Sequence, residues 1–461
     1  MMTLFRGVVS LLVAALLAGC SSGGRHRPHS TDMSLEGETE SIRRIMVRYG
    51  EEESERFSEP IGEIELQDAF DAAMAGNPAL QMHSWEYRAW ESEALQAALR
   101  PNPELAVELE NFAGSGELGG FGGSETTFAL SQVVELGGKR DKRSRLAQSA
   151  QGLAVSDFRI AQLELQRETA TSFYEVLSAQ EQLAVAEELF GVAEKMLVSV
   201  SRRVTAGSTS PVEEHLARAQ VEISRIEVSQ AERSLISART QLSLNWGGSE
   251  AKFVRAVGDI EEIRSLPSLE SLQGRVGRNP SVARWDAERE HHLATIEMER
   301  SLGTPDLSLG GGVRLYSGLD DAAFVAELGL PLPIFDRNRH EVEAARMRAR
   351  RSESERTAAT VAVLSRLSVS YDTVLAAQAE ARSLRDRAIP EAKTAFELAE
   401  EAYSRGSIQF TYVLDTERQL FELKSRYFDA LVRYHTAIAE VERLVGASIM
   451  RETNDSEGGQ Q

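Results

Sequence analysis

The sequence predicts a mainly α-helical chain with a membrane β part, built from an internal duplication. Two stretches of about 67 residues each run on without a turn cluster, and at 1.5 Å per residue each would form a helix on the order of 100 Å long. Before each stretch, apolar and polar residues alternate in two short segments, as in strands that are apolar on one face. The same order of elements occurs twice, about 200 residues apart.

The first 19 residues are predicted to be a lipoprotein signal peptide. The apolar run from Val8 to Leu17 is too short to stay in a bilayer as a spanning helix, and Leu-Ala-Gly-Cys closes it. This ending resembles the bacterial lipobox, in which the cysteine, here Cys20, is lipidated and becomes the first residue of the mature chain. Cys20 is the only cysteine, so an internal disulfide is impossible. A plain signal peptide with an incidental cysteine is the alternative.

Residues 20–60 predict a flexible leader, because they are rich in Ser, Gly, Arg and Glu and have little periodicity. The first repeat, residues 61–260, follows. Its expected elements are a helix over 66–99 that Asn77-Pro78 punctuates, a strand over 104–112, a glycine-rich loop, a return strand from 125, a long helix that ends near Gly207, and a return helix over 211–246.

The second repeat, residues 261–450, keeps the order of the first. Asn279-Pro280 and Pro305 each lie 202 residues after their counterparts Asn77-Pro78 and Pro103. Pro390 predicts a kink or an unwound turn in the second long helix. The expected elements are a helix over 281–302, strands over 307–315 and 324–332, a long helix over 337–403, a return helix over 410–445, and a disordered tail over 451–461.

Each return strand is predicted to turn into a long helix at a strand-to-helix junction. Gly137-Gly138 breaks the first return strand, and Lys139 follows. In the second repeat, Pro331 and Pro333 take the place of the paired glycines. We interpret both junctions as places where a membrane strand leaves lipid, with the adjacent basic residues near the membrane surface.

The long helices have coiled-coil spacing. The first carries an apolar residue at every seventh position and a second apolar stripe beside it. The seven-residue series is Val176, Leu183, Phe190, Leu197 and Val204. Apolar stripes on two flanks and polar residues elsewhere suit the wall of a tube that is wet inside and out. An antiparallel coiled-coil rod explains the heptads equally well, but not the strands.

The four predicted strands are each about nine to eleven residues long, which is enough to cross a bilayer when the strand is tilted. Four strands cannot close a barrel on their own, and lipid tolerates no open sheet edge. Several copies must therefore contribute to one barrel, and three copies would supply twelve strands.

Composition and motifs exclude several function classes. The formal charge of −20 argues against a nucleic-acid partner. We find no phosphate loop, nucleophile motif or His/Cys/Asp set at metal-ligand spacing, so neither an enzyme, a cofactor nor a bound metal is expected. His291 and His292 are adjacent and point to different helix faces, which makes them a poor metal pair.

The order and spacing of these elements resemble those of the TolC-like outer-membrane efflux factors, over nearly the whole mature chain. Three segments resemble the CzcC-type heavy-metal efflux branch: Leu136-Gly137-Gly138-Lys139-Arg140, residues 332–339 (LPIFDRNR) and Ser210-Pro211-Val212-Glu213-Glu214. The resemblance implies a homotrimer with a twelve-stranded β-barrel and an α-helical tunnel. It would be the lipid-anchored exit duct of a tripartite efflux pump in the Gram-negative outer membrane. It would passively conduct substrates, with heavy-metal cations as candidates, and work with a periplasmic adaptor and an inner-membrane RND-type transporter.

The resemblance also suggests functional residues near the two helix turns. The adaptor would contact the small residues of the turns, namely Gly207, Ser208, Ser210, Gly406 and Ser407. Alignment on the second turn places Tyr412 and Asp415 where the family carries acidic gate residues. Glu213 and Glu214 are candidates for a second acidic ring, which would attract cations. Ordinary solvated acids, favoured by the helix dipole, are the alternative for these two glutamates.

Two other functions remain open at this point. A non-channel coiled-coil lipoprotein would brace the periplasm and would explain the long helices. A periplasmic adaptor would require compact β-domains, and no run of strands in the sequence is long enough to form them.

Overall fold

The structure, a computed structural model, describes residues 57–319 and 321–447, which lie in one unit spanning residues 45–461. The predicted signal peptide, Cys20, most of the leader and the tail lie outside the described residues. The helices are α3 (Leu66–Gly76), α4 (Pro78–Ala97), α5 (Lys139–Thr205), α6 (Pro211–Leu244), α7 (Leu269–Gln273), α8 (Pro280–Leu302), α9 (Arg339–Ser383), α10 (Ile389–Ser404) and α11 (Phe410–Val445). The strands are β1 (Gly62–Ile64), β2 (Glu104–Glu110), β3 (Glu125–Val134), β4 (Phe253–Ala256), β5 (Leu307–Tyr316) and β6 (Asp321–Gly329).

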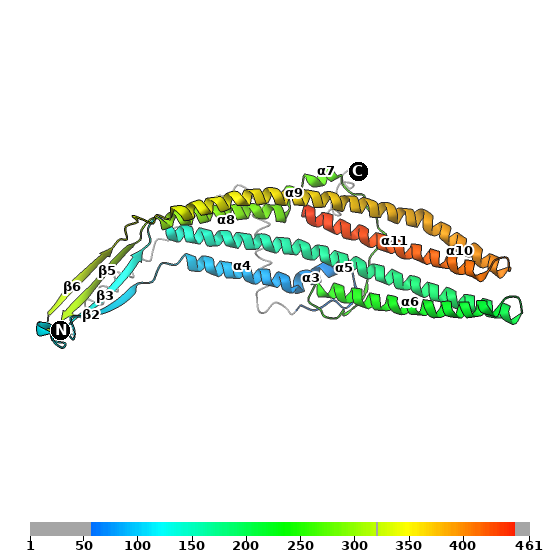
Figure 1. Cartoon of the computed structure of the whole chain (residues 1–461), viewed down its shortest axis with the longest axis horizontal. Coiled ribbons are helices and arrows are strands. Elements are labelled where there is room, and N and C mark those ends of the chain that lie inside the picture. Colours follow the sequence, from blue (N-terminus) through cyan, green and yellow to red (C-terminus); the bar gives the residue numbers. More distant parts are fainter. Residues whose placement is uncertain (1–56, 320, 448–461) are drawn as a thin grey trace, which may run out of the picture. The chain divides into compact units, whose positions relative to one another are not determined.

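The four strands predicted from alternation form one antiparallel sheet in the order β2-β3-β5-β6. The central pair, β3 and β5, joins the two repeats, with Val134 opposite Leu307 and Glu125 opposite Tyr316. The outer edges of β2 and β6 have no strand partner within the described residues. Figure 1 shows the four strands side by side, next to the starts of α5 and α9.

The return strand β6 ends earlier than the sequence predicts, at Gly329 rather than at residue 332. Pro331 and Pro333 have no backbone N–H to donate to a ladder, so the chain leaves the strand before them. The segment from Leu330 to Asn338 is an extended connection that leads into α9.

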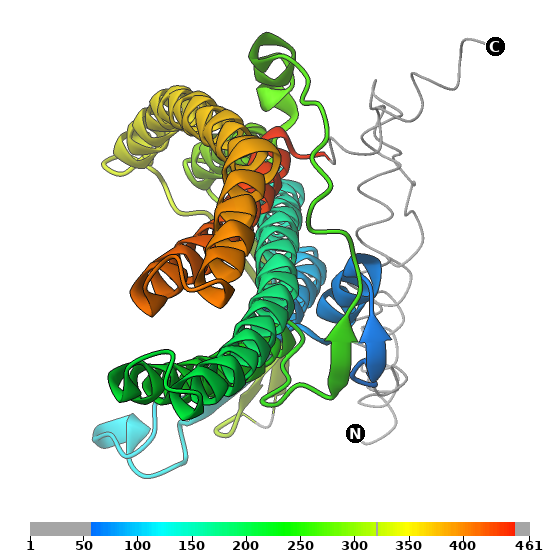
Figure 2. The same ribbon diagram turned by 90° about the vertical axis from the view of Figure 1, so that its right-hand side faces the viewer.

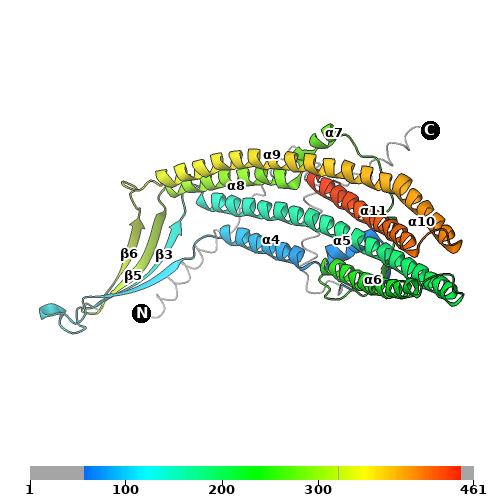
Figure 3. The ribbon, with the colours of Figure 1, turned by 45° about the vertical axis from the view of Figure 1, so that its right-hand side comes forward.

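The helix α5 is continuous over 67 residues, as the stretch without a turn cluster predicts. Its neighbours are α4 and α8 near the sheet and α6 and α11 further along, and α6 runs beside its second half (Figure 3). The apolar stripes of α5 are buried or half-buried between these neighbours, with Val176 and Val200 fully buried. Packing on both flanks explains why the helix carries two stripes.

The second long helix is not uniform. Five residues, Leu384–Ala388, form a π-helical turn between α9 and α10, directly before Pro390. Proline has no N–H to donate, so the regular pattern of hydrogen bonds is interrupted next to it, and a π turn widens the helix at this place. The predicted irregularity is therefore present, as a widened turn just before the proline.

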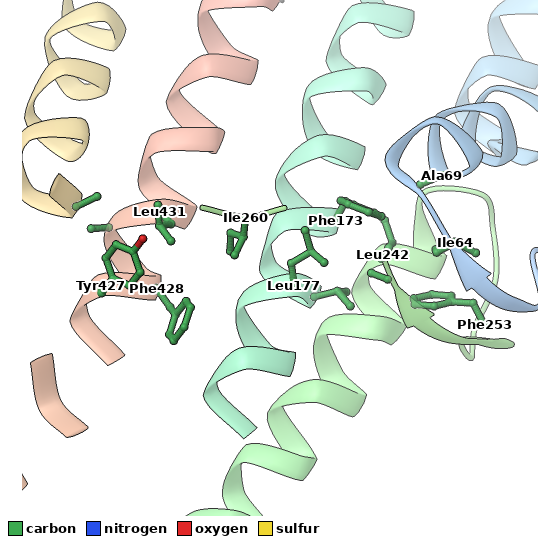
Figure 4. Close-up of a cluster of buried hydrophobic side chains, with 14 of the residues drawn as sticks. Ile64, Ala69, Phe173, Leu177, Leu242, Phe253, Ile260, Tyr427, Phe428 and Leu431 are labelled. Carbon is green, nitrogen blue, oxygen red and sulfur yellow. The ribbon is translucent and has the colours of Figure 1, made fainter. Parts of the chain in front are cut away.

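A small parallel sheet of β1 and β4 was not foreseen, because strands of three and four residues leave no clear alternation. The two strands lie side by side in Figure 2. They cover a core cluster to which α5, α6 and α11 contribute Phe173, Leu242 and Leu431 (Figure 4). Complete burial of one such side chain stabilises the fold by roughly 1.5–3 kcal/mol.

Candidate functional site

The α5–α6 turn and the α10–α11 turn are built in the same way. Gly207 has a φ of 70° and Gly406 a φ of 79°, both in the left-handed region that glycine adopts without strain. In each turn the next residue donates its N–H to the carbonyl five residues earlier, from Ser208 at 2.8 Å and from Ser407 at 3.0 Å. The side chain of Ser210 caps α6. All five predicted adaptor-contact residues are exposed.

The two turns are tied to each other by Tyr403, which is only 1% exposed. Its hydroxyl donates a 2.8 Å hydrogen bond to Glu213, its ring lies 4.4 Å from the Arg203 guanidinium carbon, and its carbonyl accepts from Arg203. Burial, followed by the hydrogen bond to Glu213, raises the pKa of the Tyr403 hydroxyl to about 12. Tyr403 therefore stays protonated and holds the end of α10 against the start of α6.

The acidic pair at the start of α6 is already bound by its own chain. Glu213 accepts from Tyr403, and Glu214 accepts from Arg218 at 2.6 Å and from Ser201 at 3.1 Å. The hydrogen bond from Arg218 holds the pKa of Glu214 below its usual value. Both residues thus serve contacts within one copy of the chain.

The other two gate candidates lie together on one exposed face of α11. Tyr412 is 61% exposed and the Asp415 side chain 73% exposed, and a spacing of three residues puts them on the same side of the helix. Among the described residues, Asp415 has one ion-pair contact, with Arg418 at 3.8 Å, which is too long for strong pairing. Asp415 is therefore free to meet a solute or another copy.

Asp415 borders a groove of about 810 Å³ between α6 and α11, floored by α5. Glu227 and Glu422 also line this groove, and Arg418 is the single basic residue among its lining side chains. Three carboxyl groups against one guanidinium make the groove favourable for cations.

Glu417 was missed by the sequence reasoning and is the most unusual acid in this region. It is 1% exposed, on the same buried face of α11 as Val413 and Leu420. Within the described part of the chain its Oε1 has no hydrogen-bond partner. Burial, and then the negative charges of Glu400 and Glu227, raise its pKa to about 7. The sequence signal was available, since an acid stands at an apolar position of the helix period.

The first strand-to-helix junction is a tight contact between the repeats. Gly137 and Gly138 have φ values of 70° and 71°, and a Cβ on Gly137 would lie 3.0 Å from the side chain of Thr304. Lys139 pairs with Asp306 at 2.7 Å and is 7% exposed. The ammonium group of Lys139 is therefore used in a contact between the two repeats.

The second junction is open by comparison. Pro331 is exposed and Pro333 half-buried in the extended segment before α9. Asn338, with a φ of 56°, takes the place of Gly138 before the helix and donates to the Glu299 carbonyl at 2.8 Å. The residues at the two junctions thus differ, but both helices begin after a left-handed residue.

Within residues 57–319 and 321–447 no group of three or more His, Cys, Asp or Glu side chains is arranged to hold a metal ion. His291 lies 3.1 Å from Ser149, whereas His292 lies 3.5 Å from Glu288. In the same part of the chain, none of the helices combines the length and the apolar character needed to cross a membrane.

Comparison with known proteins identifies the family. The family model "Outer membrane efflux protein" matches residues 69–248 and 273–447. The chain is 30% identical to the cobalt-zinc-cadmium resistance protein CzcC of Cupriavidus metallidurans, over 84% of this chain and 91% of that protein. It is 26% identical to the nickel-cobalt-cadmium resistance protein NccC of Alcaligenes xylosoxydans xylosoxydans, over 59% of this chain and 62% of that protein.

Solved structures show the same fold. A crystal structure of CusC superimposes with a TM-score of 0.69 at 17% identity, covering 83% of this chain and 92% of that chain. The outer-membrane channel OprN superimposes with a TM-score of 0.67 at 16% identity, covering 93% and 99%. The predicted TolC-like fold is thereby confirmed. The chain belongs to the outer membrane efflux protein family, whose TolC-like members are trimeric exit ducts that serve efflux pumps in the Gram-negative outer membrane.

Proposed function

We propose that this chain is the exit duct for divalent heavy-metal cations in a tripartite pump. The observation that carries the choice of cargo is the 30% identity, over most of both chains, to a cobalt-zinc-cadmium resistance protein. The carboxyl groups that line the α6–α11 groove support it, because cations are attracted to a narrow path with excess negative charge.

Three copies of the chain would assemble into the duct. Among the residues that the structure describes, the sheet has two unpaired edges, and lipid tolerates none, so the edges of neighbouring copies must pair. Twelve strands would then close one barrel, and the helices would line a periplasmic tunnel. Lipidation at Cys20 would add an anchor.

The turns would receive the periplasmic adaptor, which links the duct to an inner-membrane RND-type transporter. Gly207, Ser208, Ser210, Gly406 and Ser407 offer exposed backbone and short side chains to a partner helix. The contact between Tyr403 and Glu213 fixes both turns in one arrangement, so a partner that binds both meets a single preformed surface.

The gate would use Asp415 and Tyr412 from each copy. Asp415→Ala should raise the single-channel conductance and weaken block by multivalent cations in planar bilayers, because it removes one carboxylate per copy from the narrow point. Asp372→Ala, an exposed acid on α9 outside the groove, is the matched control and should leave both quantities unchanged. Unchanged currents in Asp415→Ala would remove Asp415 from the gate.

The cargo is tested in the native host. Deletion of this chain should lower the tolerated concentration of zinc, cobalt or cadmium, and expression of the unmodified chain should restore it. Tolerance of organic antibiotics should not change. Loss of antibiotic tolerance with unchanged metal tolerance would contradict metal cargo while leaving the duct intact.

A further inference from the structure

The two repeats make a contact inside the chain that has no counterpart at the sheet edges. Within the chain, the β3–α5 junction packs against the α8–β5 junction. Lys139 Nζ lies 2.7 Å from Asp306 Oδ1, and the N–H of Leu136 donates to the same Asp306 oxygen at 3.0 Å. Thr304 packs on the Gly137 turn. These contacts join a return strand of one repeat to the first strand of the other.

The repeat places equivalent residues at the two free edges of the sheet. The offset of 202 residues makes Glu104 the counterpart of Asp306 and Asn102 the counterpart of Thr304. Arg339 is the first residue of α9, as Lys139 is the first residue of α5, and a left-handed residue precedes each. Both edge positions therefore carry the same charges as the pair inside the chain.

These edge residues are unused within one copy. Glu104 and Arg339 are exposed, and neither has an ion-pair partner within the described residues. Glu104 begins β2, one edge strand of the sheet, whereas Arg339 follows β6, the opposite edge strand. The two edge strands are three strand spacings apart, about 14 Å at about 4.8 Å per spacing. A contact within one chain is thus out of reach.

A hollow of about 450 Å³ lies at the start of α9, lined by residues 334–341. In the first repeat, Thr304 packs on the equivalent turn, since a Cβ on Gly137 would lie 3.0 Å from its side chain. The backbone around the hollow is already fixed, since Arg337 donates to the Pro333 carbonyl and Asn338 to the Glu299 carbonyl. The hollow is therefore a preformed site next to a free sheet edge.

Apolar side chains flank both edges at the same level. Phe335 is 99% exposed and Leu332 70% exposed beside β6, while Leu95 is 69% and Leu99 56% exposed before β2. Exposed apolar groups gathered beside a polar hollow are typical of a protein interface.

We propose that the α4–β2 junction of one copy docks on the β6–α9 junction of the next, with Glu104 paired to Arg339 and Asn102 in the hollow at residues 334–341. The contact repeats, between copies, the Lys139–Asp306 contact inside each chain. Antiparallel pairing of β6 with β2 of the neighbour brings the end of one strand beside the start of the other, as this requires. The inference rests on the proposed multi-copy duct and specifies how its copies recognise each other.

Thiol cross-linking in the full chain tests the contact. Two differently tagged chains, one with Glu104→Cys and one with Arg339→Cys, are co-expressed, and outer membranes are treated with a bismaleimide whose spacer matches the length of an Arg–Glu pair, because a direct disulfide would require closer Cα atoms. We expect covalent dimers that contain both tags, and covalent trimers when both substitutions are in one chain. Lys139→Cys with Asp306→Cys is the matched control, and the same reagent should cross-link it within single chains, because the side chains of the two native residues meet there.

Charge exchange gives a second measurement. Glu104→Arg and Arg339→Glu should each lower the fraction of trimer that survives mild detergent heating, and the double exchange should restore it. If the trimers conduct ions and the control pair is cross-linked, but no covalent dimer forms, the proposed contact is overturned and the proposed duct is not. Quenching of Phe335→Trp fluorescence by brominated lipid without covalent dimers would assign the edge to lipid instead. Absence of any trimer in the unmodified protein would overturn both the inference and the proposed duct.

Discussion

Glu417→Gln should stabilise the α10–α11 hairpin relative to the unmodified chain, and this gain should be larger at pH 8 than at pH 5. Burial holds the Glu417 carboxyl neutral up to a pKa of about 7, against 4.5 for the exposed group. The folded state therefore binds the proton more tightly than the unfolded state does. Ionisation of Glu417 leaves the stability of the unmodified hairpin unchanged below about pH 4.5. The stability falls as the pH rises through the window from 4.5 to 7, and it stays reduced above that window.

The size of this effect follows from the difference between the two pKa values. At 1.36 kcal/mol per unit, ionising Glu417 at pH 8 costs about 3 kcal/mol, an upper bound because local opening lets water reach the carboxylate. Glutamine cannot ionise, so the substitution removes this penalty. It buries an amide instead, but that cost is nearly the same at every pH and cancels in the comparison between pH values.

Hydrogen exchange measured by mass spectrometry on peptides from α10 and α11 reports the opening. The ratio of the exchange rate of the unmodified chain to that of the variant should be up to about 70-fold larger at pH 8 than at pH 5. Glu397→Gln, an exposed acid on α10, is the matched control and should behave as the unmodified chain. A pH-independent ratio between Glu417→Gln and the unmodified chain would refute the argument.

Two further substitutions test the junction and the turns. Gly137→Ala should lower the melting temperature more than Gly138→Ala does. Each alanine would be strained by the positive φ, at a cost of about 1–2 kcal/mol, but only the alanine at position 137 would also meet Thr304. Equal losses of melting temperature would contradict this packing. Tyr403→Phe should lower the free energy of local opening at the turns by about 1.5–3 kcal/mol, because the Glu213 carboxylate loses its donor while the ring stays under Arg203. Unchanged hydrogen exchange at the turns would show that the hydrogen bond is not formed.

Much of the fold was readable from local patterns. Alternation located β2, β3 and β5 within a few residues, and the long stretch without a proline or a turn cluster located α5 over its full length. The two Asn-Pro pairs end and start helices because the asparagine side chain caps the helix and the proline occupies its first turn. These signals succeed because they depend on residues close in sequence.

The candidate site was less predictable, because its contacts join distant residues. Tyr403 and Glu213 are 190 positions apart, and nothing in either local sequence shows that they meet. The burial of Lys139 depends on Asp306 from the other repeat, and nothing in the local sequence around Gly137-Gly138 shows that the two residues meet. The partners of Asp415 would come from other copies, which one chain does not show.

Single-channel recording of the purified full chain in planar lipid bilayers tests the central claim most directly. The account predicts discrete, cation-selective conductance steps from trimeric protein, with block by divalent cations that weakens in Asp415→Ala. The claim would be contradicted if the protein, trimeric or monomeric, inserted no conducting pore. It would also be contradicted if a form with Cys20→Ser were recovered from the periplasm without detergent and showed no β signal by circular dichroism.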